Sequence, residues 1–117
     1  METNTEENKI TIDDFKKIEI KIGEILTAEK VEGADKLIRF TIDFKEEQPR
    51  QILSGIAMHV ADIQSLVGKK FPFVTNLAPR TIRGFESNGM ILAVSDAEGN
   101  FSLIEPTSPI TNGSRLG

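Results

Sequence analysis

The feature that most constrains the fold is the strict alternation of residues between Leu37 and Phe44. Ile38, Phe40, Ile42 and Phe44 fall on one face, with arginine, threonine and aspartate between them. A period of two is typical of a strand that buries one face. The chain must therefore build a sheet around this strand, because one strand cannot bury its apolar face alone.

Other segments show weaker signals of the same kind. Strands are predicted at residues 18–31, 50–56, 70–75, 90–95 and 101–105, with a short capped helix at 11–17 and another helix at 57–67. The alternation slips by one residue after Gly23, which predicts a β-bulge that bends the first strand.

Three strands, a short helix and two more strands are the order of an OB-fold. We therefore predict an all-β protein, a five-stranded Greek-key barrel with a short helix between strands 3 and 4. A short N-terminal helix precedes the barrel and a C-terminal extension follows it. In this interpretation residues 1–10 form a disordered acidic tail and residues 11–117 form a single domain.

The connection from Asn76 to Met90 is longer than an ordinary hairpin loop and is rich in turn-forming residues. In an OB-fold it becomes the loop between strands 4 and 5. The turn at Glu32 to Lys36 becomes the loop between strands 1 and 2. These two loops lie at the same mouth of the barrel, a usual ligand site of the fold.

The net charge of −4 argues at first against a nucleic-acid partner. Residues 1–14, however, contain five acidic side chains and one lysine, so they account for the whole excess. Residues 66–90 contain four basic side chains and only Glu86 as an acid. The body of the protein is therefore neutral and carries a local basic region.

The composition offers little for catalysis. The chain has no cysteine and a single histidine, His59, so a thiolate nucleophile, a histidine pair and a cysteine-based zinc site are excluded. No apolar run is long enough to cross a bilayer. We expect no enzyme activity, no metal, no cofactor, no membrane partner and a cytoplasmic location.

The 76–90 segment and its neighbours carry chemistry suited to structured RNA, which proteins bind through phosphates, sugars and exposed bases. Arg80 and Arg83 can contact phosphates, and Asn76 and Ser87 can contact a ribose or a base edge. Met90 can pack under a base. By residue type alone, Asn76 can equally cap a strand and Met90 can equally belong to the core.

Several segments in order resemble one known family. They are Ile12–Phe15, Ile22–Ile25, Ala34–Leu37, Arg50–Ala57, Leu66–Lys69, Asn76–Arg80 and Gly84–Met90. The chain resembles the tRNA-binding OB domain found at the C-terminus of bacterial methionyl-tRNA synthetases, as a free-standing tRNA-binding protein and in a secretion-chaperone-like branch. The resemblance covers nearly the whole chain beyond the tail.

The resemblance implies a non-catalytic module that binds the tRNA elbow with little regard to tRNA identity, either free-standing or as part of a synthetase, a ligase. The residues that match the family's RNA-contacting pattern are Lys36, Ser54, Asn76, Arg80, Arg83, Ser87 and Met90. It also implies a homodimer formed through the N-terminal helix and the C-terminal extension, and methionyl-tRNA synthetase as a possible partner. The alternative is a chaperone-like dimer that binds unfolded polypeptides.

Overall fold

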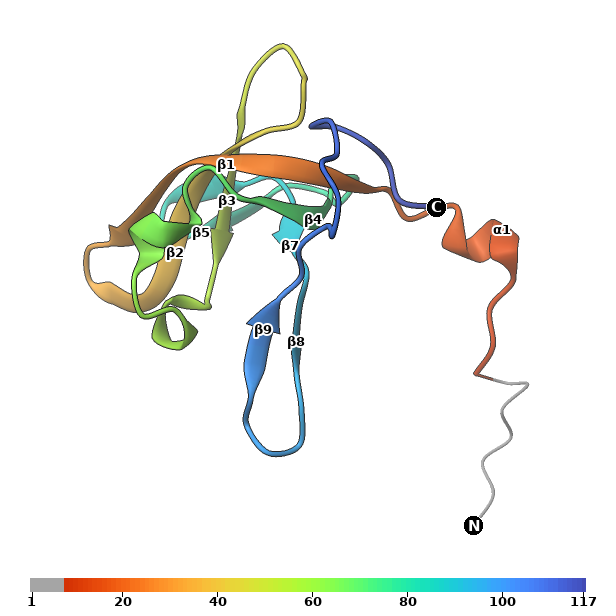
Figure 1. Cartoon of the computed structure of the whole chain (residues 1–117). Helices are drawn as coiled ribbons and strands as arrows, with labels where there is room; N and C mark the ends of the chain where they lie inside the picture. The colour runs from red at the N-terminus through yellow and green to blue at the C-terminus, as the bar shows by residue number, and fades with distance from the viewer. Residues whose placement is uncertain (1–7) are drawn as a thin grey trace.

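The computed structural model in Figure 1 describes residues 8–117 and is mostly antiparallel β structure with little helix, as predicted. The helical elements are α1 (Ile12–Phe15) and the 3₁₀-helices η1 (Ala57–His59) and η2 (Ile63–Leu66). The strands are β1 (Ile20–Val31), β2 (Ala34–Asp43), β3 (Arg50–Ser54), β4 (Lys70–Val74), β5 (Arg80–Ile82), β6 (Phe85–Ser87), β7 (Met90–Ile91), β8 (Ala93–Ser95) and β9 (Phe101–Leu103). The predicted tail, residues 1–10, lies largely outside the described residues.

The main sheet has the order β3–β2–β1–β4–β7, and all neighbouring strands are antiparallel. The predicted buried face of β2 is confirmed, since Ile38, Phe40 and Ile42 are fully buried. They belong to one core with apolar side chains from the other strands and both 3₁₀-helices. Phe44 and Phe73 meet edge to face in this core, with ring centroids 5.4 Å apart. Each such buried side chain contributes about 1.5–3 kcal/mol relative to exposure.

The predicted closed barrel is only partly supported by strand pairing. Within the described residues no ladder joins the two sheet edges, β3 and β7. Instead, the Asn88 N–H donates to the Gln51 carbonyl at 2.8 Å, and the Leu53 N–H donates to the Ser87 hydroxyl at 3.0 Å. The segment before β7 is therefore attached to β3 by separate hydrogen bonds, some of them from side chains.

The prediction of one helix over residues 57–67 is wrong. Two 3₁₀-helices stand in its place, because Val60 and Asp62 adopt extended backbone conformations that interrupt the helical path. The Asp62 carboxylate then accepts from the Gln64 N–H and caps η2. Leu66 is buried and Ile63 packs against the core. The helix-like spacing of apolar residues therefore reflects two separate 3₁₀-helices that both face the core.

The predicted strand at residues 90–95 is divided into β7 and β8, and β8 pairs with β9 in a hairpin that projects from the body (Figure 1). His59 stacks on Phe101, the first residue of β9 after the hairpin turn, with ring centroids 4.3 Å apart. The bulge predicted at Gly23 is displaced, since the register shift lies between Ile25 and Thr27. Gly23 instead marks a close approach, because a Cβ there would lie 2.5 Å from the Phe44 ring.

The N-terminal helix and the C-terminal extension are present as predicted, and the two lie close together at one side of the molecule (Figure 1). Thr11 and Asp14 form a capping box at the start of α1. The extension runs beside β1, where the Ile22 N–H donates to the Ser114 carbonyl and the Arg115 guanidinium donates to the Lys16 carbonyl. No helix among residues 8–117 is long and apolar enough to span a membrane.

Three carboxyl groups that join separate segments of the fold have pKa values below their ordinary range. Hydrogen bonds from Arg50 hold the pKa of the Glu46 carboxyl below its ordinary value, and the Thr75 hydroxyl does the same for Glu19. The Asn112 amide and the Lys45 N–H lower the pKa of Asp43. A depressed folded-state pKa contributes stability that is complete above the unfolded pKa and is lost as pH falls through the folded value.

We therefore expect the melting temperature to fall by several degrees between pH 6 and pH 3, with the loss beginning at about pH 4.5. The Glu46→Gln variant, which cannot titrate at this position, should show a smaller fall over the same range. Differential scanning calorimetry across the pH series measures both. An equal pH slope in the two proteins would mean that the Glu46–Arg50 pair does not contribute.

Candidate nucleic-acid interface

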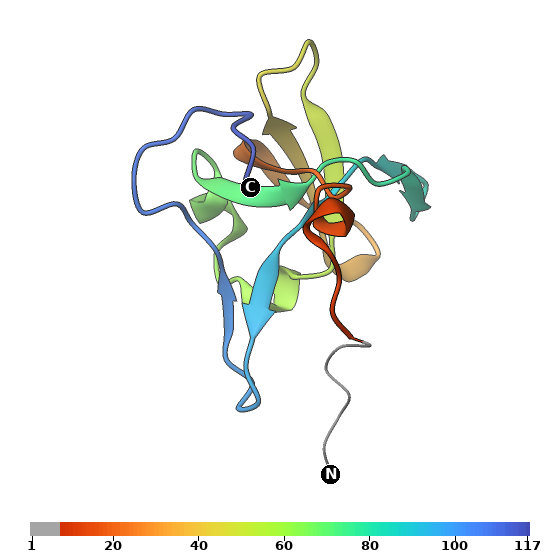
Figure 2. The ribbon, with the colours of Figure 1, turned by 90° about the vertical axis from the view of Figure 1, so that its right-hand side faces the viewer.

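The 76–90 connection contains an unpredicted hairpin. β5 and β6 pair with each other and are not part of the main sheet. Arg83 and Gly84 form its turn, with φ values of 52° and 83°. Two consecutive positive φ values are typical of a type I′ turn, which matches the twist of a two-residue hairpin. The hairpin projects from one side of the sheet in Figure 2.

The hairpin tip and the β1–β2 turn face each other across a hollow of about 440 Å³. The hollow is lined by Lys30, Val31, Glu32, Arg39, Arg83 and Phe85. The predicted convergence of the 1–2 and 4–5 loops is therefore observed. Three of the six lining side chains are basic and one is aromatic, so the hollow offers both anion contacts and a stacking surface.

Arg39 and Phe85 form the floor of this arrangement. The Arg39 guanidinium lies 4.7 Å from the centroid of the Phe85 ring and pairs with the Glu29 carboxylate. Stacking on an aromatic face and a fixed carboxylate partner together hold the guanidinium plane in one orientation. Sequence reasoning missed Phe85, because a Phe beside a glycine turn gives no sign that it packs under an arginine from β2.

Among the predicted site residues, Arg83 lines the hollow, and Arg80 is exposed on β5. Arg80 is the register partner of Ser87 on β6. Ser87 is only 2% exposed, and its hydroxyl is occupied by the Leu53 N–H. Ser54 follows Leu53 at the end of β3 and is half-buried. Ser87 and Ser54 therefore lie where the hairpin joins β3, while the two arginines are available to a ligand.

Lys36 is exposed at the start of β2 and does not line the hollow. Met90 is 43% exposed, so it is not a core residue; it pairs with Val74 at the sheet edge. Asn76 lies apart from the hairpin tip and binds the N-terminal segment. Its Oδ1 accepts from the Glu19 N–H at 2.9 Å, and its Nδ2 donates to the Lys17 carbonyl at 2.6 Å.

We expect Asn76→Ala to destabilise the fold by about 1–2 kcal/mol, because it removes two hydrogen bonds to backbone groups. Urea unfolding measures this loss. Asn76→Asp is the comparison variant, since it keeps the acceptor for the Glu19 N–H but replaces the donor by an anionic oxygen against the Lys17 carbonyl, so it should lose stability as well. If Asn76→Ala is as stable as the wild type, these two bonds contribute nothing net, and Asn76 is free to act as a contact residue.

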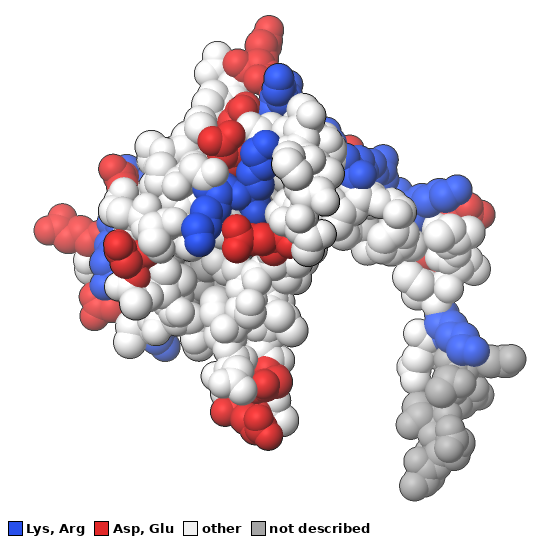
Figure 3. All heavy atoms as spheres, viewed as in Figure 1, with Lys and Arg blue, Asp and Glu red and all other residues white. Residues whose placement is uncertain are grey.

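Charge is distributed unevenly over the surface. In Figure 3 acidic side chains gather at the tip of the β8–β9 hairpin, which holds Asp96 and Glu98. Basic side chains extend along the upper edge toward α1, with acidic ones between them. The lining of the hollow, with three basic side chains and one acidic one, Glu32, is more favourable to an anion than the acidic β8–β9 tip. Within residues 8–117 no group of three or more histidine, aspartate or glutamate side chains is arranged to hold a metal ion.

Comparisons with known proteins agree with this arrangement. Residues 20–115 match the family model described as "Putative tRNA binding domain". The chain is 45% identical over 113 residues to methionine–tRNA ligase of Enterococcus faecalis, which covers 97% of this chain and 17% of that protein. The methionine–tRNA ligases it matches are much longer, and the chain spans 15–18% of their length.

Two solved structures are similar over almost their whole length. A MetRS-related protein from Pyrococcus horikoshii superposes with a TM-score of 0.86 at 35% identity, covering 93% of this chain and 98% of that one. The chaperone CsaA from Bacillus anthracis superposes with a TM-score of 0.81 at 26% identity, covering 93% and 99%.

Proposed function

The chain belongs to the family of tRNA-binding domains, and on this premise we propose that it is a non-catalytic, cytoplasmic module that binds folded tRNA at the elbow, largely independently of tRNA identity. The observation that carries the proposal is the hollow between the β1–β2 turn and the β5–β6 hairpin. Arg83, together with Lys30, supplies phosphate contacts there. The Arg39–Phe85 stack supplies a flat surface for an unstacked base, of the kind that RNA-binding proteins use at loops.

The shape of the sheet supports an OB-type barrel in this proposal. The hydrogen bonds between β3 and residues 87–88 bring the two sheet edges together without a ladder. A barrel closed in this way presents the two loops at one mouth, where OB-folds bind their ligands. Lys36, Arg80, Met90 and Ser54 are further contacts outside the hollow in this proposal, and the hydrogen bonds of Ser87 and Asn76 hold neighbouring segments in place.

The test is a titration of the protein with three RNAs of equal length. They are a folded tRNA, the same tRNA with its D-loop and T-loop changed so that they no longer pair, and the same tRNA with a different anticodon. We expect micromolar binding of the first and third and much weaker binding of the second, with affinity falling as salt rises. Equal binding of all three RNAs would refute recognition of the elbow.

We also propose that two copies of the chain associate through α1 and the C-terminal extension. Ile12 is 65% exposed, and Ile18 and Leu116 are also exposed at a groove of about 410 Å³ between these two segments. Apolar side chains gathered at such a groove are typical of an interface. Analytical ultracentrifugation should give the mass of a dimer, and Ile12→Glu should shift it toward the monomer. A monomer at tens of micromolar would refute the proposal.

A second candidate function is supported by the similarity to the chaperone CsaA of Bacillus anthracis. In that case the apolar groove would bind extended polypeptide instead of a second copy. A reduced, unfolded protein used as competitor separates the two functions. Competition by that protein with tRNA would indicate a shared surface, whereas tRNA binding that it leaves unchanged supports the RNA function. The module could act in trans or as part of a methionine–tRNA ligase. Binding of the module to a separately added ligase would support action in trans.

A further inference from the structure

Within residues 8–117, the β5–β6 hairpin has no strand pairing with the main sheet that would fix its orientation. It is a two-stranded sheet outside the main sheet, and a single hairpin is marginally stable in water. The connection leaves β4 at Thr75 and returns at Asn88, just before β7. A side chain that binds both Thr75 and Asn88 would set the angle at which the hairpin leaves the body, and one side chain binds both.

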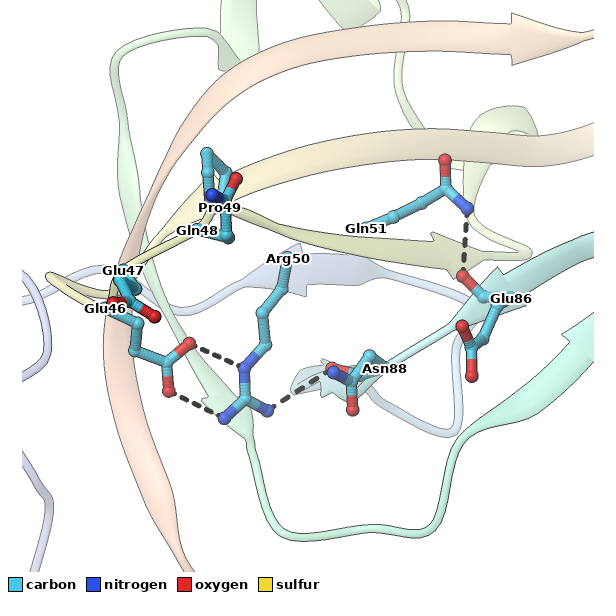
Figure 4. Close-up of a pocket in the computed structure, with 8 residues that line it drawn as sticks. All are labelled: Glu46, Glu47, Gln48, Pro49, Arg50, Gln51, Glu86 and Asn88. Atoms are coloured by element: carbon cyan, nitrogen blue, oxygen red, sulfur yellow. Dashed lines mark hydrogen bonds and ion pairs between the residues drawn. The ribbon is translucent and has the colours of Figure 1, made fainter.

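That side chain is Arg50, the first residue of β3. Its Nη1 donates to the Thr75 carbonyl at 2.6 Å and to the Asn88 carbonyl at 3.4 Å. Its Nε and Nη2 donate to the two oxygens of Glu46 at 2.8 Å and 2.7 Å (Figure 4). The guanidinium also lies over the Phe44 ring, with 5.4 Å between its central carbon and the ring centroid.

The neighbouring residue adds a second attachment from the same strand. The Gln51 side-chain amide donates to the Glu86 carbonyl at 2.9 Å (Figure 4). The Gln51 backbone carbonyl accepts from the Asn88 N–H. Residues 86–88 are thus held by the start of β3 through both side chain and backbone.

We infer that Arg50, oriented by Glu46 and supported by Gln51, is a positioning residue that fixes the β5–β6 hairpin over the RNA-binding hollow. Its side chain is 16% exposed, and each of its three nitrogens donates to an acceptor from the protein. The surrounding hollow of about 590 Å³ is lined by Glu46, Glu47 and Glu86, which repel phosphates. Arg50 therefore acts through the hairpin and does not itself contact RNA. This inference rests on the proposed function for its effect on affinity.

The test compares three variants at a temperature where all are folded. Arg50→Met keeps an unbranched apolar stem but removes the guanidinium, its contact with Phe44 and every donor. Arg50→Lys keeps the charge but cannot span all three acceptors. Glu47→Gln is the matched control, because Glu47 is exposed in the same hollow and is not one of the acceptors of Arg50. We expect Arg50→Met to weaken tRNA binding about tenfold, Arg50→Lys to lie between it and the wild type, and Glu47→Gln to stay within about threefold.

Amide hydrogen exchange supplies a readout that a general loss of stability would not reproduce. In Arg50→Met, exchange at β5 and β6 should accelerate at least tenfold, while exchange at the core strand β2 changes far less. Uniform acceleration across both regions, or tRNA affinity equal to that of the wild type, would overturn the inference. The exchange experiment needs no RNA. If the wild type fails to bind tRNA while the hairpin still loosens selectively in Arg50→Met, the proposed function fails and the positioning role stands.

Discussion

Replacing Arg80 and Arg83 together by glutamine should lower the affinity for tRNA by about 100-fold. A hydrogen bond to a charged group contributes about 1.5–3 kcal/mol, or roughly tenfold or more in affinity for each arginine. Both side chains are exposed on the hairpin, and Arg83 lines the hollow. Glutamine is the appropriate replacement at residue 83, because it bears the same cost of a positive φ as arginine does. The folded state is then expected to keep its stability within about 0.5 kcal/mol.

The salt dependence shows whether the lost contacts are to phosphates. The slope of log affinity against log salt should become shallower by about one and a half in the double variant, because two counterion-releasing contacts are removed. Lys45→Gln is the control, since it removes one charge from the exposed turn between β2 and β3. If the double variant loses no more affinity than this control, the hairpin is not the RNA-binding element.

The fold was predictable where a local pattern decides the structure. The alternation in β2 corresponds to a fully buried face, and of the two candidate caps for the short N-terminal helix, Thr11 and Asp13, Thr11 is the N-cap. These features depend on periodicity and on a hydrogen bond across three residues. The prediction of one helix over residues 57–67 failed because the same spacing of apolar residues suits two separate 3₁₀-helices.

The position of the candidate site was predictable from the sequence, but the hairpin and several of the side chains that build it were not. Fold order alone brought residues 32–36 and 76–90 together, and the hollow lies between them. The hairpin within the loop was missed because its turn begins with Arg83, where asparagine or glycine is the usual signal. Asn76 and Arg50 bind backbone groups far away in the chain, so no local pattern indicates their roles.

Gly113 lets the C-terminal extension approach the body of the protein closely. Gly113 has a φ of 87°, and a Cβ built there would lie 2.3 Å from the Phe44 carbonyl oxygen. The Gly113 N–H donates to the Ile22 carbonyl at 2.7 Å, and Leu116 binds the Ile20 carbonyl at 2.8 Å. The extension is thus packed against Phe44 and hydrogen-bonded to β1, and Leu116 lies at the groove beside α1.

We expect Gly113→Ala to destabilise this region by about 2–4 kcal/mol, because the positive φ costs about 1 kcal/mol and the clash with backbone adds about 1–3 kcal/mol. Gly99→Ala is a matched control, since Gly99 has the same φ of 87° with nothing within 4 Å of the added Cβ. The difference between the two variants in urea unfolding isolates the clash. Proteolysis should cut Gly113→Ala first within residues 104–117. The dimer of Gly113→Ala should also be weaker than that of Gly99→Ala and dissociate at a higher protein concentration, because Leu116 leaves the groove. Equal behaviour of the two variants would show that the extension is not held at Gly113.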